Sequence, residues 1–285
     1  MSVSVDLVWQ RESALGEGPI WHEGKLWWVD ISGGDLLSFD PATGDKSSWK
    51  PVGQLGTIVP RSSGGWLIAG DTGFFFFDPV TGQRDDLDSP PATMMNGRFN
   101  DGKCDPSGRF FAGTIDMDGH AAFFRLDPNL RWERLLTDVT ISNGLTWWED
   151  KFYYIDSKLR RVDVFDTNAE TGAITNRRLA FSTEQLPGLP DGMTIDRDGT
   201  LWIAFYGGAQ VVGFDRETGA TLATIPVPAL QPTACWFGGE DLGDLYITTA
   251  AQSMNDDDQA RYPLSGSLFR CRPGSIGLST VAFSG

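Results

Sequence analysis

The sequence predicts an all-β protein, a six-bladed β-propeller, and three observations support this prediction. Six segments of the 285-residue chain repeat the order loop, strand, strand, turn. The Gly or Asp that precedes the first aromatic strand of each repeat recurs at intervals of 41, 43, 42, 49 and 44 residues, a period typical of one four-stranded blade. Hydrophobic residues make up 40% of the chain and 34 residues are Gly, a mix that favours short strands joined by many turns.

The six predicted blades follow one another along the chain, and no linker or long helix separates them. Their strand pairs begin after Gly24, Gly65, Gly108, Asp150, Gly199 and Gly243. An aromatic residue recurs in the first strand of each pair, and we interpret this series as packing between blades: Trp27, Trp66, Phe110, Phe152, Trp202 and Tyr246. We therefore expect a single domain over residues 1–285.

Turn sequences and the first strand complete the predicted ring. The segments DPATG, DPVTG and DRETG end at Gly44, Gly82 and Gly219, and they predict hairpin turns in which glycine takes a positive φ. The alternating segment SVSVDLVW, which ends at Trp9, precedes the first full blade. We expect it to close the ring by pairing within the last blade, because a closed ring leaves only short, protected strand edges.

The net charge of −15 argues against nucleic acid or an anionic membrane as a partner, because like charges repel. Apolar runs such as residues 74–77 are far shorter than the roughly 20 residues that span a bilayer. No secretory signal pattern is recognised near Met1, so we expect a cytoplasmic protein, either a monomer or a weak homo-oligomer. Three widely spaced cysteines without a CxxC pair predict buried free thiols rather than disulfides or a thiolate zinc site.

Polar residues recur seven or eight residues before the aromatic strand in four of the six repeats. They are Glu17, Asn100, Asn143 and Asp191, and their intervals of 83, 43 and 48 residues correspond to two blades, one blade and one blade. The innermost strand of a propeller blade runs beside the central channel, so we expect these side chains to converge on the axis. Each is followed closely by Gly. One such pair alone would more simply form a hairpin turn, but the spacing by blades favours convergence.

All four side chains carry oxygen, and no His or Cys occupies an equivalent position. This set fits one divalent cation, Ca²⁺, Mg²⁺, Mn²⁺ or Zn²⁺, and the residues do not choose among these ions. Two carboxylates would balance the charge of the ion, and the incomplete set would leave coordination positions for water and a substrate. We therefore predict a catalytic metal site.

Four motifs around these positions are similar to those of a known family. They are LGEGPIW at residues 15–21, NGRFNDGKCDPSGRFFAGT at 96–114, SNGL at 142–145 and PDGM at 190–193. Together they resemble the regucalcin/gluconolactonase family, also called senescence marker protein or luciferin-regenerating-enzyme-like proteins, over nearly the whole chain. The resemblance implies that Glu17, Asn143 and Asp191 are metal ligands, and that Arg98 and Asn100 contact the substrate.

Two departures from the family pattern concern the mouth of the channel. Tyr206 stands where family members usually have Trp, and the loop after Gly113, IDMDGHAA, is short. Animal regucalcins place a carboxylate near the substrate in that loop. Asp116 or Asp118 is expected to take its place, and Asp116 is our candidate substrate residue.

The resemblance implies a metal-dependent hydrolase of the bacterial sugar lactonase type, which opens an aldonolactone to the sugar acid. The metal would polarise the lactone carbonyl, and Asp191 would act as the general base and return the proton to the ring oxygen. Two alternatives remain open on the same residues. One is a metal-dependent aryl esterase or phosphotriesterase, and the other is a non-catalytic calcium-binding propeller.

Overall fold

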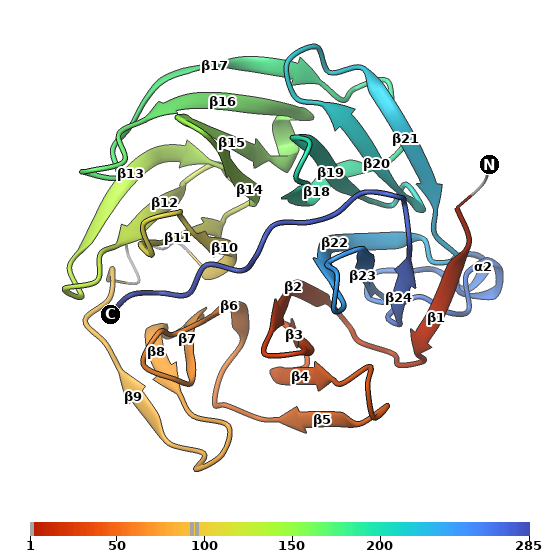
Figure 1. The fold of residues 1–285 in the computed structure, drawn as a ribbon, viewed down its shortest axis with the longest axis horizontal. Helices are drawn as coiled ribbons and strands as arrows, with labels where there is room; N and C mark the ends of the chain where they lie inside the picture. Colours follow the sequence, from red (N-terminus) through yellow and green to blue (C-terminus); the bar gives the residue numbers. More distant parts are fainter. Residues whose placement is uncertain (1–2, 92–93, 95–96) are drawn as a thin grey trace.

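The structure is a computed structural model that describes residues 3–91, 94 and 97–285. The described part of the chain forms six four-stranded sheets. Figure 1 shows these sheets arranged as six blades around a central axis. The arrangement confirms the predicted fold class, a six-bladed β-propeller that forms a single domain.

The strands of each blade lie in order from the axis to the rim. The innermost strands are β2 (Gly16–His22), β6 (Leu55–Pro60), β10 (Arg98–Cys104), β14 (Ser142–Trp148), β18 (Leu189–Ile195) and β22 (Gln231–Gly238). The second strands are β3 (Lys25–Asp30), β7 (Trp66–Gly70), β11 (Phe110–Ile115), β15 (Lys151–Asp156), β19 (Thr200–Tyr206) and β23 (Asp244–Ala250). The third strands are β4 (Asp35–Phe39), β8 (Gly73–Phe77), β12 (Ala121–Leu126), β16 (Arg161–Thr167), β20 (Gln210–Asp215) and β24 (Leu268–Cys271). The outermost strands are β5 (Lys46–Trp49), β9 (Arg84–Asp86), β13 (Trp132–Val139), β17 (Ile174–Ser182), β21 (Thr221–Pro226) and β1 (Val5–Trp9).

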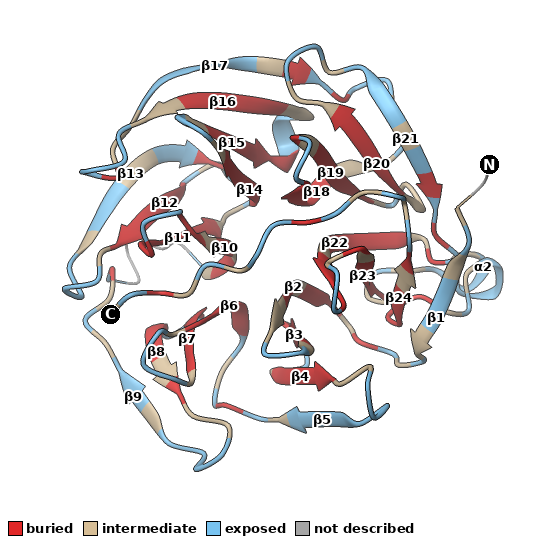
Figure 2. Ribbon diagram, viewed as in Figure 1, coloured by how far each residue is buried: buried red, intermediate tan, exposed pale blue. Residues whose placement is uncertain are grey.

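Burial decreases from the inner strands to the rim, as Figure 2 shows. Every residue of β6 and β7 is buried, whereas β5 and β21 are mostly exposed. Aromatic rings pack between neighbouring blades, with centroid distances of 4.8 Å for Trp27–Trp66 and 5.9 Å for Trp21–Tyr246. The interpretation of the recurring aromatic series as packing between blades is therefore confirmed.

The first strand closes the ring. β1 pairs antiparallel with β24, and Val5 lies opposite Cys271, so the predicted pairing within the last blade is confirmed. The three predicted hairpin turns are also present, because Gly44, Gly82 and Gly219 have φ values of 81°, 74° and 70°. These conformations are accessible to glycine without steric cost.

All six innermost strands share a β-bulge at the same place. The pairing with the second strand shifts register between Glu17 and Ile20, Leu55 and Thr57, Phe99 and Gly102, Asn143 and Leu145, Pro190 and Met193, and Pro232 and Ala234. A bulge leaves residues unpaired and redirects side chains. The Asn-Gly and Asp-Gly pairs therefore lie inside strands, and the alternative that they form hairpin turns is wrong.

Close approach of the inner strands explains the glycines that follow the polar residues. A Cβ on Gly144 would lie 2.6 Å from the carbonyl oxygen of Asp191, and a Cβ on Gly192 would lie 2.4 Å from the Cβ of Ala234. Both distances are too short for carbon, so any larger residue would push two blades apart at the axis.

The segment after β24 crosses one face of the ring over the axis, where Figure 1 shows it as a dark blue trace. Its end is held by blade 2, since Phe283 N–H donates to the Pro60 carbonyl and Ser62 N–H donates to the Phe283 carbonyl, both at 2.8 Å. Leu278 of this segment lines a cavity together with Ile20, which lies near the end of β2. The C-terminal segment therefore covers the channel at the ends of the innermost strands.

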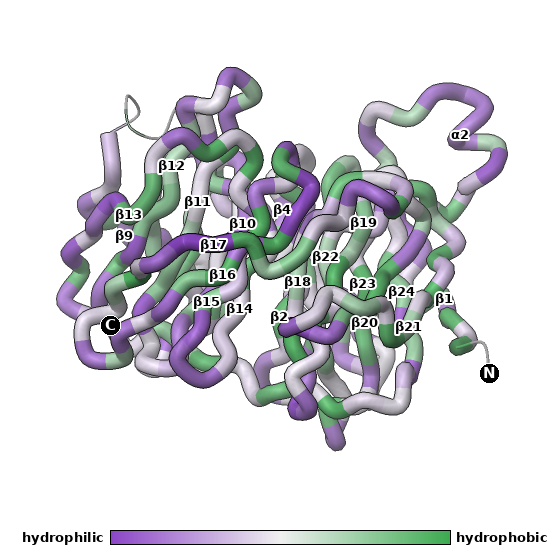
Figure 3. The backbone as a smooth tube through the Cα atoms, turned by 90° about the horizontal axis from the view of Figure 1, so that it is seen from above, coloured by the Kyte–Doolittle hydropathy of each residue, from purple (hydrophilic) through white to green (hydrophobic). Residues whose placement is uncertain are grey.

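The acidic run at residues 256–258 forms the first turn of a short exposed helix, α2 (Asp256–Arg261). The Asn255 side chain caps this helix by accepting the Asp258 N–H at 2.8 Å. Figure 3 shows its hydrophilic residues protruding from the ring. Among the described residues, no helix is long and apolar enough to span a membrane.

Candidate active site

A cavity of about 160 Å³ lies where the innermost strands begin, away from the ends that the C-terminal segment covers. Five of the six predicted site residues line it: Glu17, Arg98, Asn100, Asn143 and Asp191. They come from four different blades, so only the closed ring brings them together. The bulges of β2, β10, β14 and β18 lie at these residues.

The three predicted metal ligands are deeply buried. Glu17, Asn143 and Asp191 are 5%, 4% and 5% exposed. Burying a carboxylate or an amide costs several kcal/mol unless a partner compensates the lost hydration. Their partners therefore decide whether this cluster is structural or binds a ligand.

Ser157 fixes the orientation of the Asn143 amide. The Ser157 hydroxyl donates to the Pro190 carbonyl at 2.7 Å and accepts the Asn143 Nδ2 at 3.0 Å. Because a carbonyl oxygen only accepts, the serine proton is committed to Pro190, and the amide must present its NH₂ group to Ser157. The Asn143 Oδ1 is therefore turned away from Ser157.

Two oxygens of the cluster have no hydrogen-bond partner among the described residues. They are Asn143 Oδ1 and Asp191 Oδ1, and both are buried. Glu17 Oε2 accepts the N–H of the next residue, Gly18, at 2.8 Å. Buried oxygens left unpaired on adjacent blades fit a hard cation, which binds carboxylate and amide oxygens.

No cluster of three or more His, Cys, Asp and Glu side chains suited to a metal occurs within the described part of the chain. The axial set has two carboxylates, Glu17 and Asp191, and its third oxygen is the Asn143 amide. Such a set carries a formal charge of −2 when both acids are ionised, which matches one divalent ion.

The electrostatics of the cavity also favour a cation. Burial, and then the charge of Asp101, raise the pKa of Glu17 to about 8. Burial, and then the charge of Glu17, raise the pKa of Asp191 well above its ordinary value. The protein by itself therefore disfavours two ionised acids here, and a bound divalent ion would stabilise both in the charged form.

Arg98 and Asn100 form one unit on the blade 3 side of the cavity. Arg98 Nη1 donates to Asn100 Oδ1 at 2.8 Å and to the Phe99 carbonyl at 2.9 Å. Asn100 Nδ2 donates to the Ser142 carbonyl at 2.8 Å, which fixes its amide against blade 4. The Asn100 oxygen thus already accepts a hydrogen bond from Arg98, whereas the Asn143 oxygen accepts none.

Asp101, next to Asn100, lies on the other side of the bulge. It lines a second, smaller cavity with Lys103, deeper in the channel. Burial raises the pKa of Asp101 to about 6 against the charge of Lys103. Lys103 Nζ donates to the Met193 carbonyl at 2.8 Å and lies 4.4 Å from the Trp236 ring centre. Lys103 is therefore a packing and charge partner.

Asp116 does not line the cavity, whereas its neighbour Ile115 does. The Asp116 carboxylate accepts the Asp118 N–H at 2.9 Å and lies 3.6 Å from His120 Nδ1. Its expected contact with substrate stays a prediction. Asn96, the first residue of the quoted motif, lies outside the described residues.

Blades 2 and 6 contain none of the predicted ligands, and threonines lie at their bulges. Thr57 Oγ1 donates to the Gly102 carbonyl at 3.0 Å, and Thr233 Oγ1 donates to the Gly16 carbonyl at 2.5 Å. Both hydroxyl groups join neighbouring innermost strands, so these two blades close the ring of inner strands.

Sequence reasoning missed several residues of the cavity. They are the apolar wall residues Leu15, Ile115, Ile141 and Leu189 and the polar residues Ser157 and Gln252. Tyr206, which the sequence placed at the mouth of the channel, also lines the cavity. Ser157 begins the short 3-10 helix η1 (Ser157–Leu159) directly after β15, and Gln252 lies two residues after the end of β23. Extending the blade register to the first two residues after each second strand would have found both.

The cysteines and histidines lie apart from this cavity. Cys104, Cys235 and Cys271 are buried free thiols, as expected. His22 ends β2, at the opposite end of the strand from Glu17, and contacts Trp66 with ring centres 5.7 Å apart. Neither His22 nor His120 lines the cavity.

Comparisons with known proteins agree with the motifs. The family profile described as the SMP-30/Gluconolactonase/LRE-like region matches residues 15–251. Regucalcin of Danio rerio is 38% identical, with 100% of this chain and 99% of the relative covered. A Bacillus subtilis protein named "Putative sugar lactone lactonase YvrE" is 35% identical, with 96% of each chain covered. The solved structure of an Agrobacterium tumefaciens calcium-binding protein, regucalcin, has a TM-score of 0.93 at 25% identity, with 99% of this chain and 98% of that chain covered.

Proposed function

The chain belongs to the SMP-30/gluconolactonase/LRE-like family, and from this premise we propose that it is a metal-dependent hydrolase that opens a sugar lactone to the sugar acid. One observation carries the proposal. Two unpaired, buried oxygens, Asn143 Oδ1 and Asp191 Oδ1, lie beside Glu17 in a cavity on the axis. A purely structural cluster would pair such oxygens, because leaving them unpaired costs free energy.

Glu17, Asn143 and Asp191 are the residues that would hold one divalent ion. Ca²⁺, Mg²⁺, Mn²⁺ and Zn²⁺ all accept oxygen ligands, and the name of the Agrobacterium relative makes Ca²⁺ the first to test. When bound, the ion would supply Lewis-acid polarisation of the lactone carbonyl. The walls formed by Ile141 and Leu189 would limit the water that reaches this point.

Asp191 is the proposed general base. The carboxylate oxygen that does not bind the metal would accept a proton from the attacking water and return it to the ring oxygen as the ester bond breaks. Asp191 lies at the bulge of β18, and its side chain is 5% exposed. The rigid strand would therefore hold this oxygen in one place through both proton transfers.

Arg98 and Asn100 are proposed to orient the sugar. The Arg98 guanidinium lines the cavity, and its contact with Asn100 limits its rotation. A charged donor of this kind would bind hydroxyl or carbonyl oxygens of the substrate. Asp116, one residue beyond the wall residue Ile115, is the proposed carboxylate at the edge of the sugar site.

Removal and replacement of metal tests the proposal. The metal-stripped protein is assayed for acid release from a panel of aldonolactones while single divalent ions are added back. We expect no release without metal, restored release with at least one ion, and a loss of about 10³-fold in Asp191→Ala.

The same assay separates the alternatives. If acid is released only from aryl esters or organophosphates, these compounds and not lactones are the substrates. Tight binding of Ca²⁺ without hydrolysis of any ester would instead indicate a non-catalytic calcium-binding propeller.

A further inference from the structure

A hydrogen-bonded chain of three side chains borders the cavity on the side of blades 5 and 6. Ser32 Oγ donates to Gln252 Oε1 at 2.9 Å, and the Gln252 side chain hydrogen-bonds the Tyr206 hydroxyl. Tyr206 and Gln252 line the same cavity as Asp191. Ser32 follows β3 of blade 1, Gln252 follows β23 of blade 6, and Tyr206 ends β19 of blade 5.

The chain has a direction. Because Gln252 Oε1 accepts from Ser32, the amide group that remains for Tyr206 is Nε2, which only donates. The Tyr206 oxygen is therefore the acceptor of this bond, and its own O–H proton remains to be donated elsewhere. Burial raises the pKa of Tyr206 while the Gln252 bond opposes the rise, as expected for an N–H donated to the phenol oxygen.

Backbone contacts hold Gln252 and Tyr206 in place. Gln252 N–H donates to the Ala14 carbonyl at 3.0 Å, which joins blade 6 to blade 1. Tyr206 lies opposite Leu189 in the β18–β19 pair, and Leu189 is two residues before Asp191 in β18. The position of the phenol relative to Asp191 is thus set by one strand pair.

The polar groups of the cavity occupy two sides. Arg98 and Asn100 come from blade 3, and Tyr206 and Gln252 come from blades 5 and 6. Apolar residues, among them Ile115 and Ile141, form other parts of the wall. A ligand that matches this pattern carries oxygen atoms on both sides of a ring, as a polyhydroxylated lactone does.

We propose that Tyr206 is a specificity-determining residue that donates a hydrogen bond to a ring hydroxyl of the lactone, on the side away from Arg98, and that Gln252 and Ser32 aim this donor. The inference rests on the proposed lactonase function and deepens it. It names a residue that would favour hydroxylated lactones over unsubstituted ones.

The first test compares two lactones. Tyr206→Phe removes only the hydroxyl and keeps the ring that packs against the core. We expect its kcat/KM for D-glucono-δ-lactone to fall about tenfold, the effect of one neutral hydrogen bond. For δ-valerolactone, which has no ring hydroxyl, we expect a change below about twofold.

The second test reverses the direction of the chain. In Gln252→Glu the new carboxylate only accepts, so the Tyr206 proton would turn toward it and away from the cavity. We expect the same loss with D-glucono-δ-lactone although Tyr206 is intact. Gln259→Glu adds the same charge on the exposed helix α2 and is the matched control, for which we expect no change.

The outcomes distinguish the two proposals. Wild-type protein that hydrolyses neither lactone with any divalent ion would overturn the proposed function, and the inference with it. If the wild-type protein is active but Tyr206→Phe lowers kcat/KM equally for both lactones, or for neither, the inference alone is overturned. A Gln252→Glu variant that keeps the wild-type preference for D-glucono-δ-lactone over δ-valerolactone would also contradict the inference.

Discussion

Two of the buried charge clusters in the described part of the chain differ in their hydrogen bonds. The first, at the edge of blade 3, is centred on Arg109 and Asp105, whose side chains are 11% and 6% exposed. The second is the axial cluster of Glu17, Asn143 and Asp191. Both remove charged groups from water, which costs several kcal/mol per ion.

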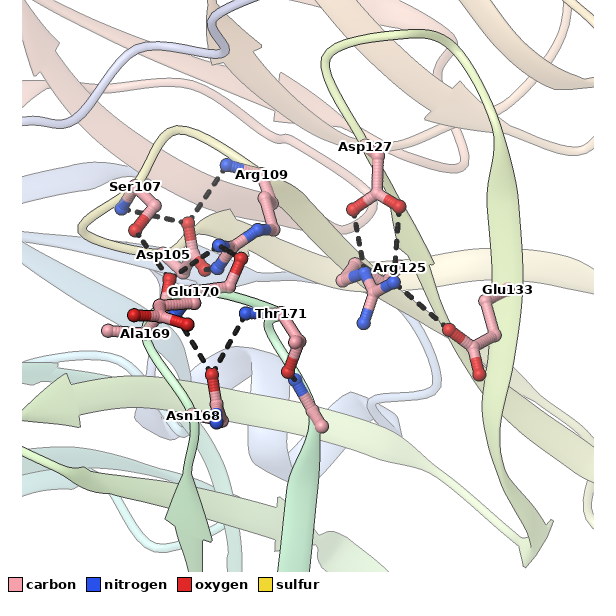
Figure 4. Close-up of polar contacts among 11 residues, drawn as sticks. Asp105, Ser107, Arg109, Arg125, Asp127, Glu133, Asn168, Ala169, Glu170 and Thr171 are labelled. Carbon is pink, nitrogen blue, oxygen red and sulfur yellow. Dashed lines mark hydrogen bonds and ion pairs between the residues drawn. The ribbon is translucent and has the colours of Figure 1, made fainter.

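The Arg109 cluster compensates that cost within the chain. Arg109 Nη1 lies 2.7 Å from Asp105 Oδ2, and its Nη2 donates to the Glu170 carbonyl at 2.8 Å. Asp105 Oδ1 also accepts the N–H groups of Ser107 and Arg109. Figure 4 shows Arg109 joined in this way to the loop of Ala169 and Glu170, which belongs to blade 4.

The axial cluster leaves part of its cost uncompensated. Asn143 Oδ1 and Asp191 Oδ1 are unpaired within the described residues, and burial raises the pKa of both acids, with the charge of Glu17 raising that of Asp191 further. The contrast indicates that burial of charge alone does not mark a functional site. The two unpaired oxygens that converge from blades 4 and 5 beside a cavity favour a ligand at the axis, and this assignment stays a prediction.

Removing the proposed base would break the axial cluster most severely. We expect Asp191→Asn to lower kcat/KM for a sugar lactone about 10³-fold, because the amide neither accepts the proton nor balances the metal charge. The same change should raise the thermal midpoint of the metal-free protein, since it removes a buried acid. Assays and thermal melts of the metal-free protein measure both effects, and a variant with wild-type kcat/KM would contradict the assignment.

Breaking the Arg109 cluster should lower stability and leave activity unchanged. Arg109→Met leaves Asp105 buried without its charge partner, so we expect the free energy of unfolding to fall by about 3 kcal/mol. Activity per folded molecule should stay unchanged. Arg272→Met, which removes an exposed pair with Asp241, is the control and should lower stability far less, because water screens an exposed pair. Denaturant unfolding measures both values, and equal losses in the two variants would contradict the distinction.

A pH dependence should separate the axial cluster from the rest of the chain. The folded pKa of Glu17 is raised from 4.5 to about 8, with burial as the first cause. Folded metal-free protein therefore binds more protons than unfolded protein in this range, and stability is lost as pH rises. We expect a loss of about 2 kcal/mol between about pH 6 and pH 8, as the pKa of Glu17 is approached.

Denaturant unfolding of metal-free protein at several pH values measures this loss. Glu17→Gln should show a flatter profile, and added divalent metal should flatten the wild-type profile because the bound ion favours the ionised acids. A wild-type profile that matches that of Glu17→Gln without metal would contradict the raised pKa of Glu17.

The smallest effect is expected for Thr57, which lies on the innermost strand β6 of blade 2. Thr57→Val removes one hydroxyl that bonds the Gly102 carbonyl, and we expect it to cost about 1 kcal/mol of stability. Metal affinity and lactone hydrolysis should not change, because blade 2 contains none of the predicted ligands. Isothermal titration with the divalent ion checks this, and weaker binding would show that Thr57 belongs to the site.

The sequence by itself determined the fold and four positions on the axis. Six repeats in register specify six blades, since each strand pattern is local and the period is fixed by the blade. The same register placed Glu17, Asn100, Asn143 and Asp191 on innermost strands, where the structure has them. The regular repeat made this part of the site accessible to sequence reasoning.

Only the tertiary structure decided how the side chains point and what they meet. Asn100 and Asp101 are neighbours in sequence, yet the bulge sends them to different cavities. Asn143 presents its oxygen because the Ser157 hydroxyl, whose proton is donated to the Pro190 carbonyl, accepts from its NH₂ group. Tyr206 keeps a free proton because Ser32 orients Gln252. These partners lie on separate strands or blades, so hydrogen bonds that form only when the ring closes fix the direction of each group.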